Sequence, residues 1–285
     1  TPLSIRYKNE LISTSEAGRF PVSLSVGALD KPQWLEQFGP RRVIGRTQPA
    51  ADTLEVTVRV GDYELVERYK LHAENARLDR SITLTNRGTE TTKLRNLNFK
   101  TLGVAATKEG FYRFPQQWPP LNHAFSEMKK GARQSRSRGI VPVIAELSPR
   151  RSLLWLSYAM DSGAARIEEN EGQFDVVQDV YAAGYLKPNQ PQEIGFVSLL
   201  VVDAGYWDAL PAMWSWMDHV GLKVPADRPE WVQDAILYCF HPGGTIGSNF
   251  KDLGGFKPAT EHLLPRIPKL GANAIWIMPV EQKSP

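Results

Sequence analysis

Five carboxylates are concentrated between residues 168 and 179, and acidic groups in pairs can carry out hydrolytic acid–base chemistry. Retaining glycoside hydrolysis, for example, needs two carboxyl groups about 5–5.5 Å apart across a sugar ring. The residues concerned are Glu168, Glu169, Glu171, Asp175 and Asp179. They flank an expected strand, and their spacing places no two of them across a cleft. We therefore interpret them as a solvated strand edge.

The five histidines have no spacing that would form a metal site or a nucleophile–base pair. No two are four residues apart, and none has metal-ligand spacing with a carboxylate. They are His72, His123, His219, His241 and His262. The glycine-rich stretch GGTIGSNFKDLGG, residues 243–255, contains neither a dinucleotide fingerprint nor a P-loop lysine. We predict no metal and no cofactor.

One further segment has the residue types of a sugar cleft. In FPQQWPPLNHAF, residues 114–125, His123 lies among aromatic residues and prolines. It could line a sugar cleft, and ordinary loop packing is the alternative. Trp118 in the same segment would bind a glycan weakly if its indole is exposed.

Length and composition allow one large domain or two ordinary ones. The 285 residues are 42% hydrophobic and carry a net charge of +3, which is no nucleic-acid signature. A basic cluster without aromatic residues is interpreted as a solvated loop rather than a binding patch. It comprises Lys129, Lys130, Arg133, Arg136 and Arg138. No run of about 18 apolar residues is present, so no membrane span is expected.

Cys239 is the single cysteine, so the chain can form no intrachain disulfide. This is compatible with the cytoplasm and with exported bacterial enzymes, and we favour the extracytoplasmic placement. The first residue is Thr1, so we expect a processed mature form or an excised part of a longer protein.

Residues 1–203 have the pattern of many short strands. The run TLEVTVRV, Thr53–Val60, alternates apolar and polar residues, and a Gly–Asp turn at residues 61–62 leads into a second such run. Another turn signal, NRG, stands at residues 86–88. This punctuation predicts a mainly β domain, a large antiparallel β-sandwich of two facing sheets. We expect no helix longer than about ten residues before Asp203.

Residues 204–230 are predicted to be a linker helix followed by a connector. Over residues 206–219, Trp207, Leu210, Trp214 and Met217 lie at helical spacing. We predict a helix that packs these aromatic residues inward, and a sugar-stacking platform is the alternative. The proline-rich, charged run KVPADRPE then suits a connector.

Residues 231–285 have an α/β pattern. Strands are predicted over residues 234–240 and 274–280, with a helix over 259–270 that Pro265 and Pro268 should shorten or kink. A strand, a helix and a returning strand form a parallel βαβ unit. The second strand is apolar on both faces, as in the centre of a parallel sheet. Its residues Ile275, Trp276, Ile277, Met278 and Val280 should therefore be covered by further chain, by another copy or by the sandwich.

This C-terminal segment resembles the start of the catalytic barrel in the α-amylase family of glycoside hydrolases. The matching residues are Leu270, Gly271, Ala274, Ile275, Trp276 and Pro279 at the second strand, with residues 235–240 as the first strand. The resemblance covers about 55 residues and joins two strands and a helix in the family's order. It implies a (β/α)₈ barrel of which residues 231–285 contain the first βαβ unit.

The N-terminal region resembles, more loosely, the large β-sandwich of galactose-mutarotase-like domains. The run YELVERYKLHAENARLDRSITLTNRGTETTKLRNL and the later LKPNQPQEIGFVSLLVV carry this resemblance. Such sandwiches precede the catalytic barrel in several glycosidase families. The resemblance implies a supersandwich-like domain over residues 1–203.

Together the resemblances imply the N-terminal portion of a glycoside hydrolase that acts on α-glucosidic bonds of oligo- or polysaccharides. In the α-amylase family the catalytic Asp, Glu and Asp follow barrel strands four, five and seven, which would lie beyond Pro285. The chain alone should then be inactive. Tyr238 and His241, at the end of the first barrel strand, would face the active-site end. They are candidate substrate contacts, with plain packing as the alternative.

Two other functions remain open on the sequence. One is a non-catalytic carbohydrate-binding or subunit-contact sandwich, with a homo-oligomer or a partner chain covering the C-terminal strand. The other is a mutarotase-like sugar epimerase, which needs a histidine and a carboxylate facing each other in the concave sheet. In each case the expected ligand is a carbohydrate, an α-glucan or an oligosaccharide.

Overall fold

The computed structural model describes residues 4–14, 21–27, 31–104, 107, 109–114, 123–131, 133–137, 143–157, 163–170, 172–180, 184–240 and 256–277. The chain divides into two compact units, Thr1–Leu222 and Lys223–Pro285, called here the first and the second unit. None of the helices in the described part of the chain is long and apolar enough to cross a membrane.

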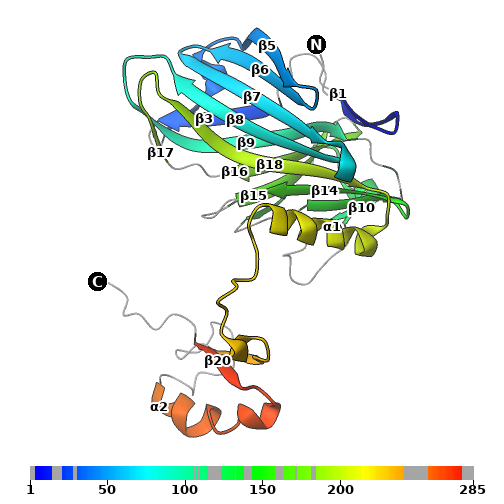
Figure 1. Cartoon of the computed structure of the whole chain (residues 1–285), viewed down its shortest axis with the longest axis vertical. Coiled ribbons are helices and arrows are strands. Elements are labelled where there is room, and N and C mark those ends of the chain that lie inside the picture. The colour runs from blue at the N-terminus through cyan, green and yellow to red at the C-terminus, as the bar shows by residue number, and fades with distance from the viewer. Residues whose placement is uncertain are drawn as a thin grey trace. The chain divides into compact units, whose positions relative to one another are not determined.

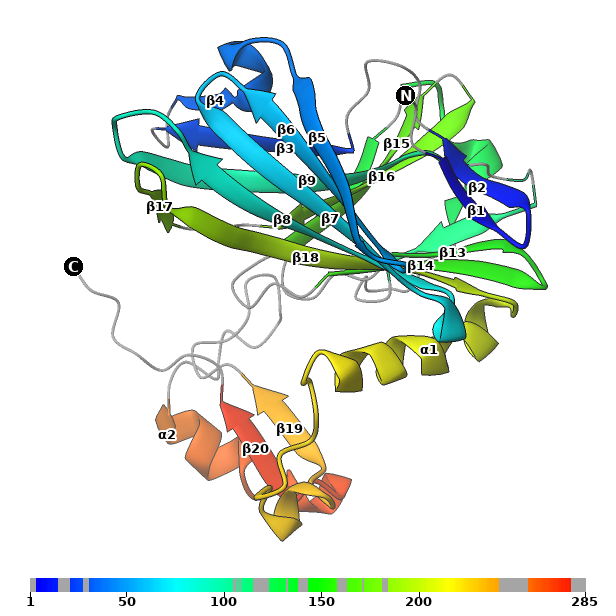
Figure 2. The same ribbon diagram turned by 45° about the horizontal axis from the view of Figure 1, so that its top comes forward.

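The first unit is a sandwich of two sheets, each with nine strands among the described residues (Figure 1, Figure 2). Sheet 1 contains β1 Ser4–Tyr7, β2 Glu10–Thr14, β3 Val22–Gly27, β4 Pro32–Trp34, β9 Thr92–Val104, β12 Arg133–Ser137, β15 Gly163–Asn170, β16 Gln173–Val180 and β17 Gly184–Leu186. Sheet 2 contains β5 Arg42–Ala50, β6 Thr53–Val60, β7 Tyr63–His72, β8 Arg77–Asn86, β10 Phe111–Arg113, β11 His123–Ala124, β13 Val143–Ser148, β14 Arg151–Ser157 and β18 Pro191–Val202. The predicted mainly β, antiparallel sandwich is confirmed.

Local sequence explains the meander of sheet 2. The alternating run of β6 pairs with β7 from Thr53↔Lys70 to Val60↔Tyr63, closed by the predicted Gly61–Asp62 turn. β8 continues the sheet beside β7. β18 then lies between β8 and β14, two strands that it does not follow directly in the chain. Short 3₁₀ turns connect several strands; they are η1 Leu35–Phe38, η2 Ala73–Asn75 and η3 Phe125–Glu127. No helix longer than ten residues precedes Asp203 in the described chain, as predicted.

The sandwich interior contains two hydrophobic clusters. The first is built around Leu24, Leu65, Ile82 and Leu97. The second is built around Trp155 with aromatic and aliphatic residues of β9–β16. Burial of each such side chain stabilises the fold by about 1.5–3 kcal/mol.

The basic cluster is not the loop that we expected. Its middle part, Arg133–Ser137, is the edge strand β12, which pairs antiparallel with β15 from Arg133↔Glu168 to Ser137↔Ala164. Lys129 and Lys130 are exposed in the preceding turn.

The helix α1 spans Tyr206–His219, as predicted. Its buried face agrees with the predicted one only in part. Leu210 and Met217 pack against a third cluster on the outer face of sheet 2, but the helix residues buried there are Tyr206, Ala209, Met213 and Trp216. Trp207 and Trp214 are exposed instead. The Glu146 carboxylate accepts a hydrogen bond from the Tyr206 backbone N–H at 2.6 Å and so fixes the first turn.

The second unit contains the predicted parallel βαβ arrangement. β19 Leu237–Phe240 pairs parallel with β20 Ala274–Ile277. Between them lie α2 Phe256–Pro258, a π-helical turn Ala259–Leu263 and the 3₁₀ turn Pro268–Leu270. Pro265 and Pro268 therefore interrupt the helix, as predicted. A further 3₁₀ turn, η4 Glu230–Val232, precedes β19. Ile275 is 41% exposed, Trp276 59% and Ile277 41%, whereas Met278 and Val280 lie outside the described residues. Because this apolar strand is exposed, we still expect it to be covered by further chain, by another copy or by the sandwich.

Gly103 should be the least replaceable glycine of sheet 1. Its φ is +59°, and a Cβ there would overlap the Thr14 carbonyl oxygen. We expect Gly103→Ala to lower the free energy of unfolding by at least about 2 kcal/mol, measured by urea denaturation. Gly172→Ala is the matched control, because Gly172 has φ +83° but open space around a Cβ. Equal losses for both variants would contradict the steric explanation.

Acid should loosen the β1–β2 hairpin through Asp203. Lys8 donates a hydrogen bond to this carboxylate at 2.5 Å, and Tyr7 and Arg151 also donate to it. The Lys8 bond, with those from Tyr7 and Arg151, lowers the pKa of Asp203 to about 2 from the ordinary 3.8. A depressed folded-state pKa gives stability that is present above about pH 3.8 and lost as the pH falls toward 2.

Asp203→Asn should therefore flatten the dependence of the urea midpoint on pH between 4 and 2. Asp227→Asn, which removes an exposed carboxylate of the connector, is the control and should leave the slope unchanged. A wild-type slope in the Asp203→Asn variant would show that Asp203 is not the group that titrates.

Candidate functional site

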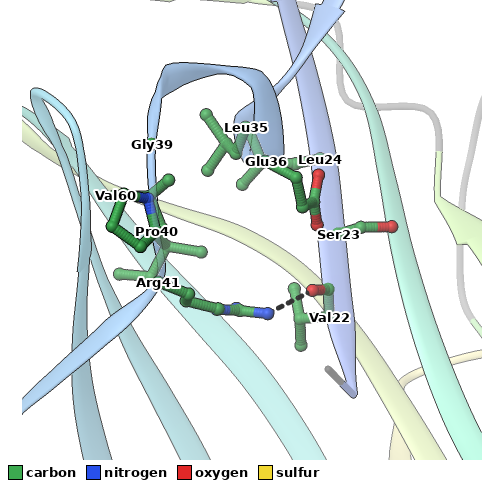
Figure 3. A pocket seen from close by; sticks show the side chains of 10 residues that line it. Val22, Ser23, Leu24, Leu35, Glu36, Gly39, Pro40, Arg41 and Val60 are labelled. Carbon is green, nitrogen blue, oxygen red and sulfur yellow. Dashed lines mark hydrogen bonds between the residues drawn. The ribbon is translucent and has the colours of Figure 1, made fainter. Parts of the chain in front are cut away.

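A pocket of about 390 Å³ opens at one edge of the sandwich (Figure 3). This volume lies within the usual range of small-molecule sites, about 300–1,000 Å³. Aliphatic side chains form most of its wall, and three polar residues stand among them. The lining residues are Val22, Ser23, Leu24, Leu35, Glu36, Gly39, Pro40, Arg41, Val60 and Leu65.

The 3₁₀ turn η1 positions the polar part of the wall. The Trp34 backbone N–H donates to Gln37 Oε1 at 2.9 Å, which caps the turn, and Leu35 is buried in the first cluster. Gly39 has φ +132°, a conformation that residues with a Cβ rarely adopt. This bend and Pro40 lead the chain into β5, with Arg41 directed at β3 (Figure 3).

Arg41 forms the charged end of the pocket. Its guanidinium donates to the Val22 carbonyl at 2.6 Å and to Glu67 Oε1 at 2.6 Å. The side chains of Arg41 and Glu67 are only 6% and 7% exposed. Such a buried, charge-assisted pair is costly to break by removing one partner.

Glu67 also connects the pocket with Tyr69 and Arg80 deeper in the sandwich. Tyr69 OH donates to Glu67 Oε2 at 2.8 Å. Burial, together with the Glu67 charge, raises the pKa of Tyr69, so the phenol stays protonated and remains a donor. Arg80 donates to the carbonyls of Lys100 and Pro21 at 3.0 and 2.8 Å, and its guanidinium stacks on the Tyr69 ring at 5.6 Å.

These residues form one line between the two hydrophobic clusters of the sandwich. On each of β7, β8 and β9, the next buried residue two positions beyond the first cluster is polar. These residues are Glu67, Arg80 and Thr101, respectively. Thr101 Oγ1 accepts a hydrogen bond from Trp155 Nε1 at 3.0 Å, which joins the line to the second cluster. We call Arg41, Glu67, Tyr69, Arg80 and Thr101 the polar belt.

The predicted site residues are not gathered at this pocket. His123 lies in β11 at the edge of sheet 2, half-buried, with its ring stacked on Tyr112 at 5.2 Å. This contact fits the packing alternative, and a role in sugar contact stays a prediction. Tyr238 lies half-buried in β19 of the second unit. Trp118 and His241 lie outside the described residues.

The carboxylates of β15 and β16 are not a solvated edge. Arg166 donates to both Asp179 oxygens at 2.5 Å and to Glu168 Oε1 at 2.7 Å. Asp175 is 3% exposed and accepts from the Gly103 backbone N–H at 2.9 Å. Only Glu169 among the described members is held at a turn, where it accepts backbone N–H groups of Gly131 and Gly172. Glu171 lies outside the described residues.

These carboxylates accept hydrogen bonds from an arginine and from backbone N–H groups. Such contacts fit a structural role better than a role in acid–base catalysis. Around the pocket, Glu36 is the one carboxylate of the described lining, so the two-carboxylate arrangement of glycoside hydrolysis is not formed there. The pocket can bind a polar ligand against an aliphatic wall. Sequence reasoning missed the polar belt, although Glu67 and Tyr69 follow Tyr63 and Leu65 on the inward face at period two.

The comparisons with known proteins find likeness in structure alone. No protein-family model matches the chain, and no curated protein matches it. A doubly substituted variant of GH36 α-galactosidase AgaA from Geobacillus stearothermophilus in complex with stachyose is 14% identical with a TM-score of 0.51. The match covers 89% of this chain and 39% of that one.

Two further solved structures are similar at lower scores. GH36 α-galactosidase AgaB from Geobacillus stearothermophilus is 13% identical with a TM-score of 0.48, over 64% of this chain and 30% of that one. The α-galactosidase from Lactobacillus brevis is 12% identical with a TM-score of 0.48, over 89% and 37%. The chain thus spans about a third of the length of these three α-galactosidase structures. Its fold is related to that of a glycoside hydrolase.

Proposed function

We propose that the chain is the N-terminal, non-catalytic part of a glycoside hydrolase that acts on α-glycosidic bonds. One observation carries the proposal. The match to the stachyose-bound α-galactosidase covers 89% of the chain, more than the first unit, Thr1–Leu222, can supply alone. The likeness therefore extends from the sandwich into the βαβ segment, the order of domains that the sequence predicts.

The catalytic carboxylates are then expected outside this chain. The second unit has one parallel strand pair, whereas a (β/α)₈ barrel needs eight strands and carries its active site at their C-terminal ends. We keep the α-amylase-like start of a barrel as part of the proposal, with Tyr238 and His241 as substrate contacts at that end. Exposed Ile275, Trp276 and Ile277 support a continuation of the sheet.

The bond specificity is proposed in two forms. The sequence resemblance favours α-glucosidic bonds, whereas the structural neighbours are α-galactosidases, and two of them hold raffinose or stachyose. We place α-galactosides first, because that likeness covers most of the chain. Hydrolysis assays of the complete gene product on raffinose and on maltotriose separate the two forms.

The chain by itself should release no sugar from either substrate. Protein-dependent release by the purified chain would overturn the assignment of catalysis to residues outside it. A complete gene product that hydrolyses neither substrate would overturn the hydrolase function. The second candidate, a carbohydrate-binding module, would then remain, because the edge pocket is open to a polar ligand.

The epimerase alternative gains little support. The structure does bring a histidine and a carboxylate together, with His72 Nε2 2.8 Å from Asp79 Oδ2. Asp79 is also paired with Arg77 and accepts a hydrogen bond from Ser198 at 2.5 Å. Ser198 in turn accepts from Trp216 of α1, so this carboxylate holds the helix to the sheet.

We expect Glu36→Ala to weaken raffinose binding by about tenfold to a hundredfold, because a hydrogen bond to a charged group contributes about 1.5–3 kcal/mol. Isothermal titration of the chain measures the dissociation constant. Glu90→Ala, at an exposed turn away from the pocket lining, is the matched control. Unchanged affinity in the Glu36 variant would remove the edge pocket from the proposal.

A further inference from the structure

Two tryptophans lie exposed on the outer side of α1. Trp207 is 68% exposed and Trp214 57% exposed, while Trp216 of the same helix is buried. Positions seven residues apart lie on the same side of a helix, about 10.5 Å apart along its axis. The two indoles therefore form one row, with the exposed Pro211 between them.

The row is attached to a rigid support. Tyr206 packs edge-on against the Trp207 ring with centroids 5.0 Å apart. The Arg113 guanidinium of β10 lies 5.1 Å from the Trp207 ring and 4.3 Å from the Tyr206 ring. Trp216 Nε1 donates to Ser198 at 2.8 Å and ties the helix to sheet 2. A ring held in this way loses little freedom when a ligand binds it.

The chemistry of this face distinguishes a glycan from a protein partner. A helix that docks into a protein groove presents a continuous apolar face, with anchors at positions i, i+3, i+4 and i+7. Here Leu210, Met213 and Met217 pack inward against the third cluster. The outward side presents flat indoles together with hydrogen-bonding groups, which are Asp208, Ser215 and Asp218.

We propose that Trp207 and Trp214 form a stacking platform for a neutral polysaccharide, separate from the edge pocket. Pyranose rings combine apolar C–H faces with equatorial hydroxyls, so they match indole faces bordered by carboxylates and a hydroxyl. The two aspartates repel uronic acids, which makes a neutral chain the preferred ligand. Binding here does not depend on hydrolysis by any other part of the protein.

Affinity electrophoresis in gels that contain guar galactomannan or soluble starch tests the platform. We expect the wild-type chain to be retarded in at least one gel, and the Trp207→Ala/Trp214→Ala variant to lose about tenfold or more in affinity. The Phe replacements at the same two positions should keep part of the retardation. Trp231→Ala is the matched control, because Trp231 is 64% exposed in the second unit. Polygalacturonate should give no retardation.

Each outcome decides the proposal. Equal retardation of the wild type and the double alanine variant, or no retardation of the wild type in either gel, overturns it. A double variant that changes the sedimentation of the chain from dimer to monomer, with retardation unchanged, would make the face a protein interface instead. Raffinose titration of the same variant should be unaffected, so a failed platform is distinguishable from a failed edge pocket.

Discussion

Replacing Glu67 with alanine should lower the free energy of unfolding by about 3–5 kcal/mol, because the variant breaks the buried ion pair between Glu67 and Arg41. The Arg41 and Glu67 side chains are 6% and 7% exposed, so the pair is largely shielded from solvent. The Tyr69 hydroxyl loses its acceptor in the same substitution. Urea denaturation followed by tryptophan fluorescence measures the change.

Two companions make this result interpretable. Replacing both members of the pair by apolar side chains, as in Arg41→Met/Glu67→Leu, should recover most of the loss, since a buried ion pair and an apolar pair of similar volume contribute similar stability. Glu55→Ala breaks a surface pair with Arg68, whose side chain is 53% exposed, and should cost less than about 1 kcal/mol. A loss for Glu67→Ala no larger than that for Glu55→Ala would mean that the belt is not desolvated.

Replacing Trp216 with alanine should cost about 3–5 kcal/mol, the usual loss when a fully buried tryptophan is removed. Trp216 is 1% exposed and packs with Leu154, Leu200 and Met213. Trp216→Phe keeps most of the volume, so it should cost less than Trp216→Ala. It still removes the Nε1 donor to Ser198, and the loss of that bond should cost about 1 kcal/mol.

Trp214→Ala is the control on the same helix and should change stability by no more than about 0.5 kcal/mol. The helical circular dichroism signal and the urea midpoint together report whether α1 stays on sheet 2. A small effect of Trp216→Ala would show that α1 is held by its ends rather than by its buried face.

The elements with strong local patterns could be predicted from the sequence. β6 spans Thr53–Val60 and α1 spans Tyr206–His219, as predicted, because each pattern repeats with the period of one backbone geometry. For α1, the predicted inward packing of Leu210 and Met217 is confirmed, whereas that of Trp207 and Trp214 was wrong. Trp207 and Trp216 are equally apolar, and only the position of sheet 2 decides which of them is covered.

The site was less predictable, because its residues meet through strand pairing over long sequence distances. Arg41 reaches Glu67 and Val22 across the two sheets, and no local pattern contains such a contact. Asp179 looked like a solvated carboxylate until the hairpin β15–β16 placed Arg166 beside it. A charged residue in a strand can be assigned to the buried or to the solvent-exposed face only when the register of that strand is known.

The polar belt has a consequence for the cooperativity of the sandwich. A line of hydrogen-bonded polar side chains, with one ion pair, separates the two hydrophobic clusters. Opening one of them exposes the belt but not the other cluster, so partial unfolding has a natural boundary at Arg80 and Thr101. Amide hydrogens on the two sides of this boundary should exchange as two cooperative groups with different free energies of opening.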